Sequence, residues 1–168
     1  MRLIVPTLEE MRETLLRGAA CWRLPDRICD DDAPPPDFMM QRSLNSIADR
    51  PELATWFAPR LFWAKEIGAI VGSGSFKTAP DHPHGAEIGY GIAARFQGHG
   101  YATAGVRLII TEAFAFPQVK EIFAEAQPDN LPSIRVLQKC DFAPDDEKSN
   151  SNDDRILRFH LIRRAWRS

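Results

Sequence analysis

The chain has 168 residues, 44% of them hydrophobic, and its 21 Lys and Arg against 23 Asp and Glu leave a net charge of −2. This length suits one globular domain with a single core and is short for two. The near-neutral balance argues against a protein that mainly wraps nucleic acid, because neutralising phosphates requires concentrated Lys and Arg. No apolar run approaches the ~20 residues that span a bilayer, and acidic residues follow the N-terminus too soon for a signal-peptide core. We therefore expect one cytoplasmic domain.

The first part of the chain predicts one strand and two helices. Residues 2–5 are typical of a short strand, and Thr7 stands where an N-cap is needed before a helix over residues 8–17. Residues 29–37 join three consecutive acids to three prolines, which predicts a loop. A second helix is expected over residues 38–48.

Strands and helices then alternate to the C-terminus. The alternation of strand 87–93 places Ile88, Tyr90 and Ile92 on one face and Glu87 on the other. The expected elements are a hairpin of residues 61–66 and 69–76, strand 87–93, helix 101–115, strand 121–126, a helix over 133–139 beginning at Pro132, a polar loop over 145–154 and strand 155–163. This order predicts an α+β domain with three layers, α/β/α, and a mixed, mostly antiparallel sheet of about six to seven strands with one strand–helix–strand crossover.

Cysteine and histidine spacing does not favour a metal or redox site. Cys21, Cys29 and Cys140 lack CxxC spacing and are interpreted as reduced structural thiols. His82 and His84 could approach a metal from one side of a strand, but without further Cys or His ligands a polar turn is the favoured interpretation. We expect no metal ion.

The most informative segment, residues 87–103, leads from a strand through a glycine-spaced loop into a helix. Gly98 and Gly100 leave backbone N–H groups uncovered where the helix begins, so that the loop and the helix dipole together can hold phosphate oxygens. The spacing matches the dinucleotide fingerprint weakly, because Thr103 stands where the last glycine is required, and no P-loop sequence occurs. A Rossmann or P-loop enzyme is therefore not favoured.

Arg95, Gly98 and Gly100 fit the R/Q-x-x-G-x-G/A signature of the acetyl-CoA-dependent N-acetyltransferases of the GNAT superfamily, which this chain resembles. Downstream, NLPSIRVLQKCDF resembles a block of the Rim-type branch, which acetylates the N-termini of ribosomal proteins and relatives. The resemblance covers residues 87–142, about a third of the chain. It implies a single N-acetyltransferase domain over residues 1–168, with acetyl-CoA as the donor. It also implies direct transfer to a primary amine, on a protein N-terminus or a small molecule, in a ternary complex without a metal.

The resemblance also implies where the cofactor binds. In the family two central strands splay apart, the pantetheine arm pairs with the edge of the first of them, and the pyrophosphate lies on the glycine loop. The cofactor-binding residues implied in this way are Ile92, Ala93, Arg95, Gln97, Gly98, His99, Gly100, Tyr101, Ala102, Asn130 and Ser133. The alternative is a strand-to-helix turn that needs glycine for its dihedral angles alone.

Two residues are candidate catalytic groups. Attack by an amine requires that its ammonium proton be accepted, and Glu87 is the candidate base, acting through a water. The alternative is a carboxylate that is solvated or paired with a Lys. Ser133 could return a proton to the thiolate, because the helix lacks the Tyr that other family members use, although Asn130 and Ser133 are also ordinary helix caps. A backbone N–H near Ile92 could polarise the thioester carbonyl.

Some features stay open at this stage. Asp141 replaces the family's glycine before Phe142, where a left-handed residue is expected. An aromatic cluster could line an acceptor pocket, although core packing is favoured; it consists of Trp56, Phe57, Phe62 and Trp63. A solvated face is likewise the favoured interpretation of Arg155, Arg158, Arg163, Arg164 and Arg167.

The expected partners are acetyl-CoA and an amine acceptor. Neither a membrane nor nucleic acid is expected, and the oligomeric state stays open, with a homodimer as one alternative. The alternative function is a non-catalytic acyl-CoA-binding or peptide-recognition domain of the same fold.

Overall fold

The computed structural model describes residues 1–145 and 156–166. Its centre is an eight-stranded sheet with the order β1-β3-β4-β5-β6-β8-β7, and β2 pairs additionally with β4. The strands are β1 (Arg2–Ile4), β2 (Ile28–Cys29), β3 (Arg60–Ala64), β4 (Ala69–Phe76), β5 (Ala86–Ile92), β6 (Glu121–Ala126), β7 (Ala143–Pro144) and β8 (Leu157–Ile162). The helices are α1 (Leu8–Arg17), α2 (Asp37–Asp49), α3 (Ala54–Phe57), α4 (Tyr101–Ala115) and α5 (Leu131–Lys139).

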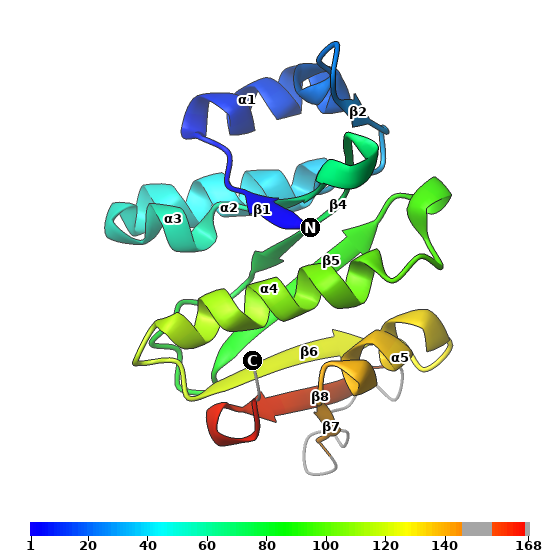
Figure 1. Cartoon of the computed structure of the whole chain (residues 1–168). Coiled ribbons are helices and arrows are strands. Elements are labelled where there is room, and N and C mark those ends of the chain that lie inside the picture. Colours follow the sequence, from blue (N-terminus) through cyan, green and yellow to red (C-terminus); the bar gives the residue numbers. More distant parts are fainter. Residues whose placement is uncertain (146–155, 167–168) are drawn as a thin grey trace.

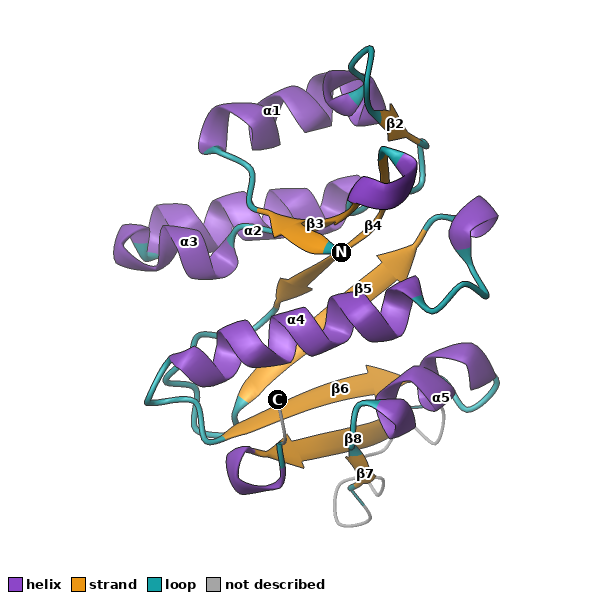
Figure 2. Ribbon diagram, viewed as in Figure 1, coloured by secondary structure: helices purple, strands orange, loops and turns teal. Residues whose placement is uncertain are grey.

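Helices cover both faces of this sheet. Figures 1 and 2 show α4 in front of β5 and α5 in front of β6, with α2 behind. The strands pair antiparallel except for β2 with β4 and β5 with β6. The predicted three-layer α/β/α class with a mixed, mostly antiparallel sheet is therefore confirmed. The strand count exceeds the expected six to seven because β2 and β7, of two residues each, are too short to leave a pattern.

Most predicted elements occur with small shifts at their ends. Thr7 caps α1 in a complete capping box with Glu10. The helix α5 begins at Leu131, so that Pro132 is its second residue and not its first. The last strand begins at Leu157, whereas Arg155 and most of the predicted loop, residues 146–154, lie outside the described residues.

Two glycines let α4 lie unusually close to the sheet. A Cβ on Gly74 of β4 would come 2.4 Å from the Ile109 side chain, and a Cβ on Gly105 of α4 would come 2.5 Å from the Phe62 ring. Such approaches are shorter than any van der Waals contact, so the helix seats only on glycine. The position of the α4 N-terminus relative to β5 is thereby fixed by the core.

The strands β5 and β6 splay apart. They pair only at Ala86 with Ile122 and at Glu87 with Phe123, and beyond these pairs they diverge (Figure 1). On its other edge β5 pairs with β4 along five successive residues. The remainder of β5 therefore has no strand partner on the β6 side, and its backbone groups on that edge are open to a ligand.

The aromatic cluster belongs to the core, as the favoured interpretation has it, since each ring is at most 7% exposed; the residues are Trp56, Phe57, Phe62 and Trp63. The expectation of a solvated arginine face is wrong for two residues. The Arg158 Cζ atom lies 3.6 Å from the centroid of the Phe123 ring, and the Arg163 guanidinium donates to the carbonyl of Phe116 at the end of α4. Arg164 is exposed, and Arg155 and Arg167 lie outside the described residues.

Candidate functional site

The loop from β5 to α4 meets two requirements at once. Gly98 and Gly100 have φ of 79° and 82°, the left-handed region that favours glycine. A Cβ at either position would meet no atom within 4 Å. The first helical bond of α4 is made by the Ala104 N–H to Gly100, which leaves the preceding N–H groups without helical acceptors. This geometry is therefore compatible with both interpretations of the loop: a turn that needs glycine for its dihedral angles alone, and an open loop that binds an anion.

A cavity of about 450 Å³, here called the α4 cavity, lies between this loop, the open edge of β5 and α5. Eight of the eleven residues implied for cofactor binding line it: Ile92, Gln97, Gly98, Gly100, Tyr101, Ala102, Asn130 and Ser133. The Ile92 carbonyl accepts a hydrogen bond from Gln97 Nε2 at 3.0 Å. The structure thus brings the glycine loop and the start of α5 to one hollow, although they are 30 residues apart in sequence.

The other three implied residues make contacts elsewhere. The Ala93 N–H donates to the Val71 carbonyl at 2.9 Å, so that it serves the sheet. Arg95 Nη1 lies 3.4 Å from an Asp30 carboxylate oxygen. His99 is exposed, with its Nδ1 2.7 Å from the Gln97 carbonyl oxygen.

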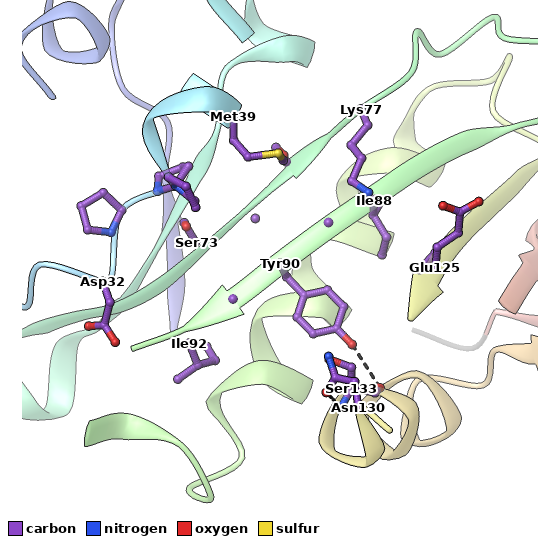
Figure 3. A pocket seen from close by; sticks show the side chains of 18 residues that line it. Asp32, Met39, Ser73, Lys77, Ile88, Tyr90, Ile92, Glu125, Asn130 and Ser133 are labelled. Carbon is purple, nitrogen blue, oxygen red and sulfur yellow. Dashed lines mark hydrogen bonds between the residues drawn. The ribbon is translucent and has the colours of Figure 1, made fainter. Parts of the chain in front are cut away.

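A second cavity of about 450 Å³ lies on the opposite face of the sheet and is here called the β4 cavity. Figure 3 shows side chains from several segments pointing into it. Its lining includes Asp32, Met39, Ser73, Ser75, Lys77 and Glu125, and it shares Tyr90, Gly91, Ile92, Asn130 and Ser133 with the α4 cavity. The two cavities therefore adjoin at the splay between β5 and β6.

Glu87 lies beside the β4 cavity and is not part of its lining. Its carboxylate forms a hydrogen-bonded ion pair with Lys77 Nζ, and its side chain is only 15% exposed. Lys77 itself lines the cavity. The contact with Lys77 agrees with the alternative in which Glu87 is paired with a lysine. The Lys77 side chain lies between the Glu87 carboxylate and the cavity.

The start of α5 forms one wall of the splay. The Ser133 N–H donates to Asn130 Oδ1 at 3.2 Å, which is the capping arrangement. The Tyr90 hydroxyl crosses from β5 and donates to the Ser133 carbonyl at 3.2 Å (Figure 3). Burial raises the pKa of the Tyr90 hydroxyl above its usual range, so this group stays protonated at neutral pH.

The comparisons with known proteins agree with this geometry. A family model described as an acetyltransferase (GNAT) domain matches residues 36–143, more than half of the chain. The chain belongs to the GNAT acetyltransferase family. The resemblance seen in the glycine loop is thereby confirmed.

Relatives of this GNAT chain include the uncharacterized N-acetyltransferase p20 of Bacillus licheniformis, 28% identical over 107 residues. That match covers 61% of this chain and 60% of the relative, so the chain spans about three-fifths of the relative's length. Among solved structures, the ribosomal-protein-S5-alanine acetyltransferase of Vibrio fischeri has a TM-score of 0.59 at 19% identity, covering 80% of each chain. The spermidine N-acetyltransferase of Vibrio cholerae, in complex with CoA and spermine, has a TM-score of 0.62 at 13% identity, covering 98% of this chain and 96% of that one. The likenesses to the two solved structures show a shared fold.

Several lining residues of this GNAT domain were missed from the sequence. Arg135 and Lys139 bring two cations to the α4 cavity, and their i, i+4 spacing on α5 was the available signal. Ser73 and Ser75 of β4 and Lys77 directly after it occupy every second position, so a period of two could have placed them on one face. Within residues 1–145 and 156–166, no group of three or more His, Cys, Asp or Glu side chains could hold a metal ion. No helix in the same described part has the length and apolarity to cross a membrane.

The GNAT helix α5 ends in a Schellman motif with aspartate at the left-handed position. Asp141 has φ 65°, the only positive φ outside glycine among the described residues. The Phe142 N–H donates to the Leu137 carbonyl and the Asp141 N–H to the Gln138 carbonyl, both at 3.1 Å. Asp141 thus takes the place of the family's glycine, and the turn keeps its left-handed geometry.

Proposed function

We propose that this GNAT protein is an N-acetyltransferase that moves an acetyl group from acetyl-CoA directly to a primary amine in a ternary complex. The observation that carries the proposal is that two cavities on opposite faces of the sheet adjoin at five shared residues in the splay. A donor in one cavity and an acceptor in the other can meet there without an acyl-enzyme. In the described part of the chain, none of the three cysteines lines either cavity.

The α4 cavity has the features that a CoA thioester requires. Free N–H groups at the α4 N-terminus, with Arg135 and Lys139 across the cavity, suit a pyrophosphate. The backbone groups of Tyr90 and Ile92 point away from β4, because Gly91 and Ala93 between and beyond them face β4. That open edge suits a pantetheine amide, and an N–H near Ile92 is placed to polarise the thioester carbonyl.

The proton steps are assigned to groups beside the splay. In this proposal Glu87 accepts the ammonium proton of the acceptor through a water, from its place behind Lys77. The collapse of the tetrahedral intermediate breaks the carbon–sulfur bond, and the thiolate takes a proton from a hydroxyl. Ser133 is the proposed donor, and Tyr90 is a second protonated hydroxyl at the same junction.

The acceptor is proposed to be a protein N-terminus or a small-molecule amine. The fold neighbours acetylate, by their names, a ribosomal-protein alanine and spermidine, so both classes belong in the test. Purified full-length protein is supplied with acetyl-CoA and a panel of N-terminal peptides, polyamines and simple amines, and release of free CoA thiol is measured. Amine-dependent multiple turnover is expected, with the amine-free reaction as the control. Stoichiometric acetyl-CoA binding without turnover on any acceptor would instead identify a non-catalytic acyl-CoA-binding domain.

A further inference from the structure

Two serines on β4 form a polar floor beneath the β4 cavity. Ser73 and Ser75 are 6% and 5% exposed, in a strand whose residues are all buried. Neither hydroxyl has a hydrogen-bond partner among residues 1–145 and 156–166, and both serines line the cavity. Both side chains line the cavity, so their two hydroxyls, each able to accept a hydrogen bond, offer a polar surface to a ligand that enters it.

The neighbouring strand leaves these hydroxyls uncovered. Gly91 of β5 lies directly across the ladder from Ser73, and a Cβ on Gly91 would meet no atom within 4 Å. Gly89 lies across from Ser75 in the same way. A Cβ there would first meet the flexible end of Lys77, at 2.9 Å. Because residues paired across the ladder share a face, the missing side chains create the space above the floor.

The charges around the floor favour a ligand that donates hydrogen bonds. Figure 3 shows Asp32 and Glu125 at opposite ends of the cavity, and both residues are exposed. One oxygen of Asp32 accepts the Ala94 N–H at 2.7 Å, which holds that carboxylate in place. Lys77 is neutralised by its ion pair with Glu87. The cavity is therefore rich in acceptor oxygens and carries net negative charge.

We propose that Ser73 and Ser75 select the acceptor, favouring a small primary amine that carries a second, positively charged N–H donor group. The two hydroxyl oxygens accept hydrogen bonds from the second nitrogen, and Asp32 and Glu125 provide the attracting field. This inference rests on the proposed acetyl transfer, in which the β4 cavity holds the acceptor. It assigns the two serines to specificity, apart from the proton steps.

The test compares three acceptors of similar length: 1,4-diaminobutane, butylamine and 4-aminobutyrate. The wild-type protein is expected to give the highest kcat/KM with the diamine. The double variant Ser73→Ala with Ser75→Ala is expected to lose about 100-fold in kcat/KM for the diamine, about tenfold for each of the two lost hydrogen bonds, with butylamine nearly unchanged. Its acetyl-CoA affinity and Tm are expected to be retained, because the removed hydroxyls have no partners within the described chain. Ser43→Ala, at a buried serine that lines neither cavity, is the matched control.

A second measurement separates this inference from the proposed function. The shift in Tm that 1,4-diaminobutane produces in the CoA complex reports binding without turnover. A shift in the wild type that the double variant loses supports the serine floor even if no acetyl transfer occurs. Preference for 4-aminobutyrate would show that Lys77 selects an anionic acceptor and would overturn the inference. The inference would also be overturned if the double variant lost kcat/KM equally for all three acceptors, or lost none while the wild type prefers the diamine. The absence of both turnover and a Tm shift with 1,4-diaminobutane would overturn it as well.

Discussion

The two cavities that adjoin at the splay are built in different ways. The α4 cavity depends on backbone, from the glycine loop, the first turn of α4 and the open edge of β5. The β4 cavity depends on side chains that come from the loop before α2, from α2 itself, from β4 and from β6. The first is lined by two stretches of sequence, residues 90–103 and 130–139, and the second is assembled from segments up to about 100 residues apart.

This contrast teaches where recognition and selectivity reside. Backbone amides are the same in every residue, so a site built from them needs a fixed loop geometry and tolerates many neighbours. A site built from hydroxyls and carboxylates changes its ligand whenever one side chain changes. Apart from Arg135 and Lys139, the α4 cavity is accordingly expected to tolerate side-chain changes that do not fill it, whereas the β4 cavity is expected to respond to each one.

Filling the backbone-built cavity is expected to have the largest effect. Gly98→Trp places a large side chain in open space beside the free N–H groups, and acetyl-CoA affinity is expected to fall by about 100-fold, or about 2.7 kcal/mol. Binding is measured by calorimetry. The control is Gly18→Trp, since Gly18 also has a positive φ, 55°, with no atom within 4 Å, and lines neither cavity. Equal affinity in a folded Gly98→Trp protein would contradict the assignment.

Removing the candidate base is expected to have an effect of similar size at neutral pH, which becomes smaller as the pH rises. Glu87→Gln is expected to lower kcat by about 100-fold at neutral pH, within the range for general bases. The loss shrinks as pH rises toward the pKa of the acceptor amine, because the amine then loses its proton to water. Acetyl-CoA affinity is expected to stay unchanged. The pH–rate profile is the measurement.

The ion pair supplies a control for this experiment. Lys77→Met removes the partner of Glu87 and keeps the carboxylate. A base acting through water retains its pH dependence in that variant. If both variants show the same loss at every pH, Glu87 serves only to hold Lys77, and its catalytic role is rejected.

The smallest expected effect is at the end of α5. Asp141→Gly removes the cost of a left-handed non-glycine residue and is expected to raise the free energy of unfolding by about 1 kcal/mol, or about 2–4 °C in Tm. Denaturant unfolding and acetyl-CoA titration check the two halves of this prediction, since cofactor affinity is expected to be unaffected. A loss of stability would mean that the aspartate side chain contributes interactions that outweigh the strain.

The same contrast explains how much could be read from the sequence. The start of α4 and the cap of α1 were predicted because Gly100 acts through its own backbone geometry and Thr7 through its hydroxyl, which accepts from the nearby Glu10 N–H. The assignments of the glycine loop to cofactor binding and of Glu87 and Ser133 to proton transfer stay predictions. The start of α4 and the cap of α1 are local features, so a short stretch of sequence is enough to determine each of them.

The acceptor side could not be predicted in this way. Ser73 and Ser75 in a strand indicate nothing until the register sets them opposite Gly91 and Gly89. Likewise, the pairing of Glu87 with Lys77 requires that β4 and β5 be neighbours, and the two-residue strands β2 and β7 depend wholly on partners elsewhere. These features depend on pairing between strands that are distant in sequence, so no single segment is enough to predict them.

The seating of α4 on two glycines makes the hydrophobic core a determinant of donor affinity. A helix of 15 residues is a rod about 22 Å long, and its contacts at Gly105 and Gly74 lie near its first turn and its middle. A methyl group added at Gly105 would push the rod off Phe62 and carry the first turn with it. A substitution at Gly105, which contacts no ligand, would then lower the affinity for acetyl-CoA. A mutational scan that sorts positions into stability and function would place Gly105 in both classes.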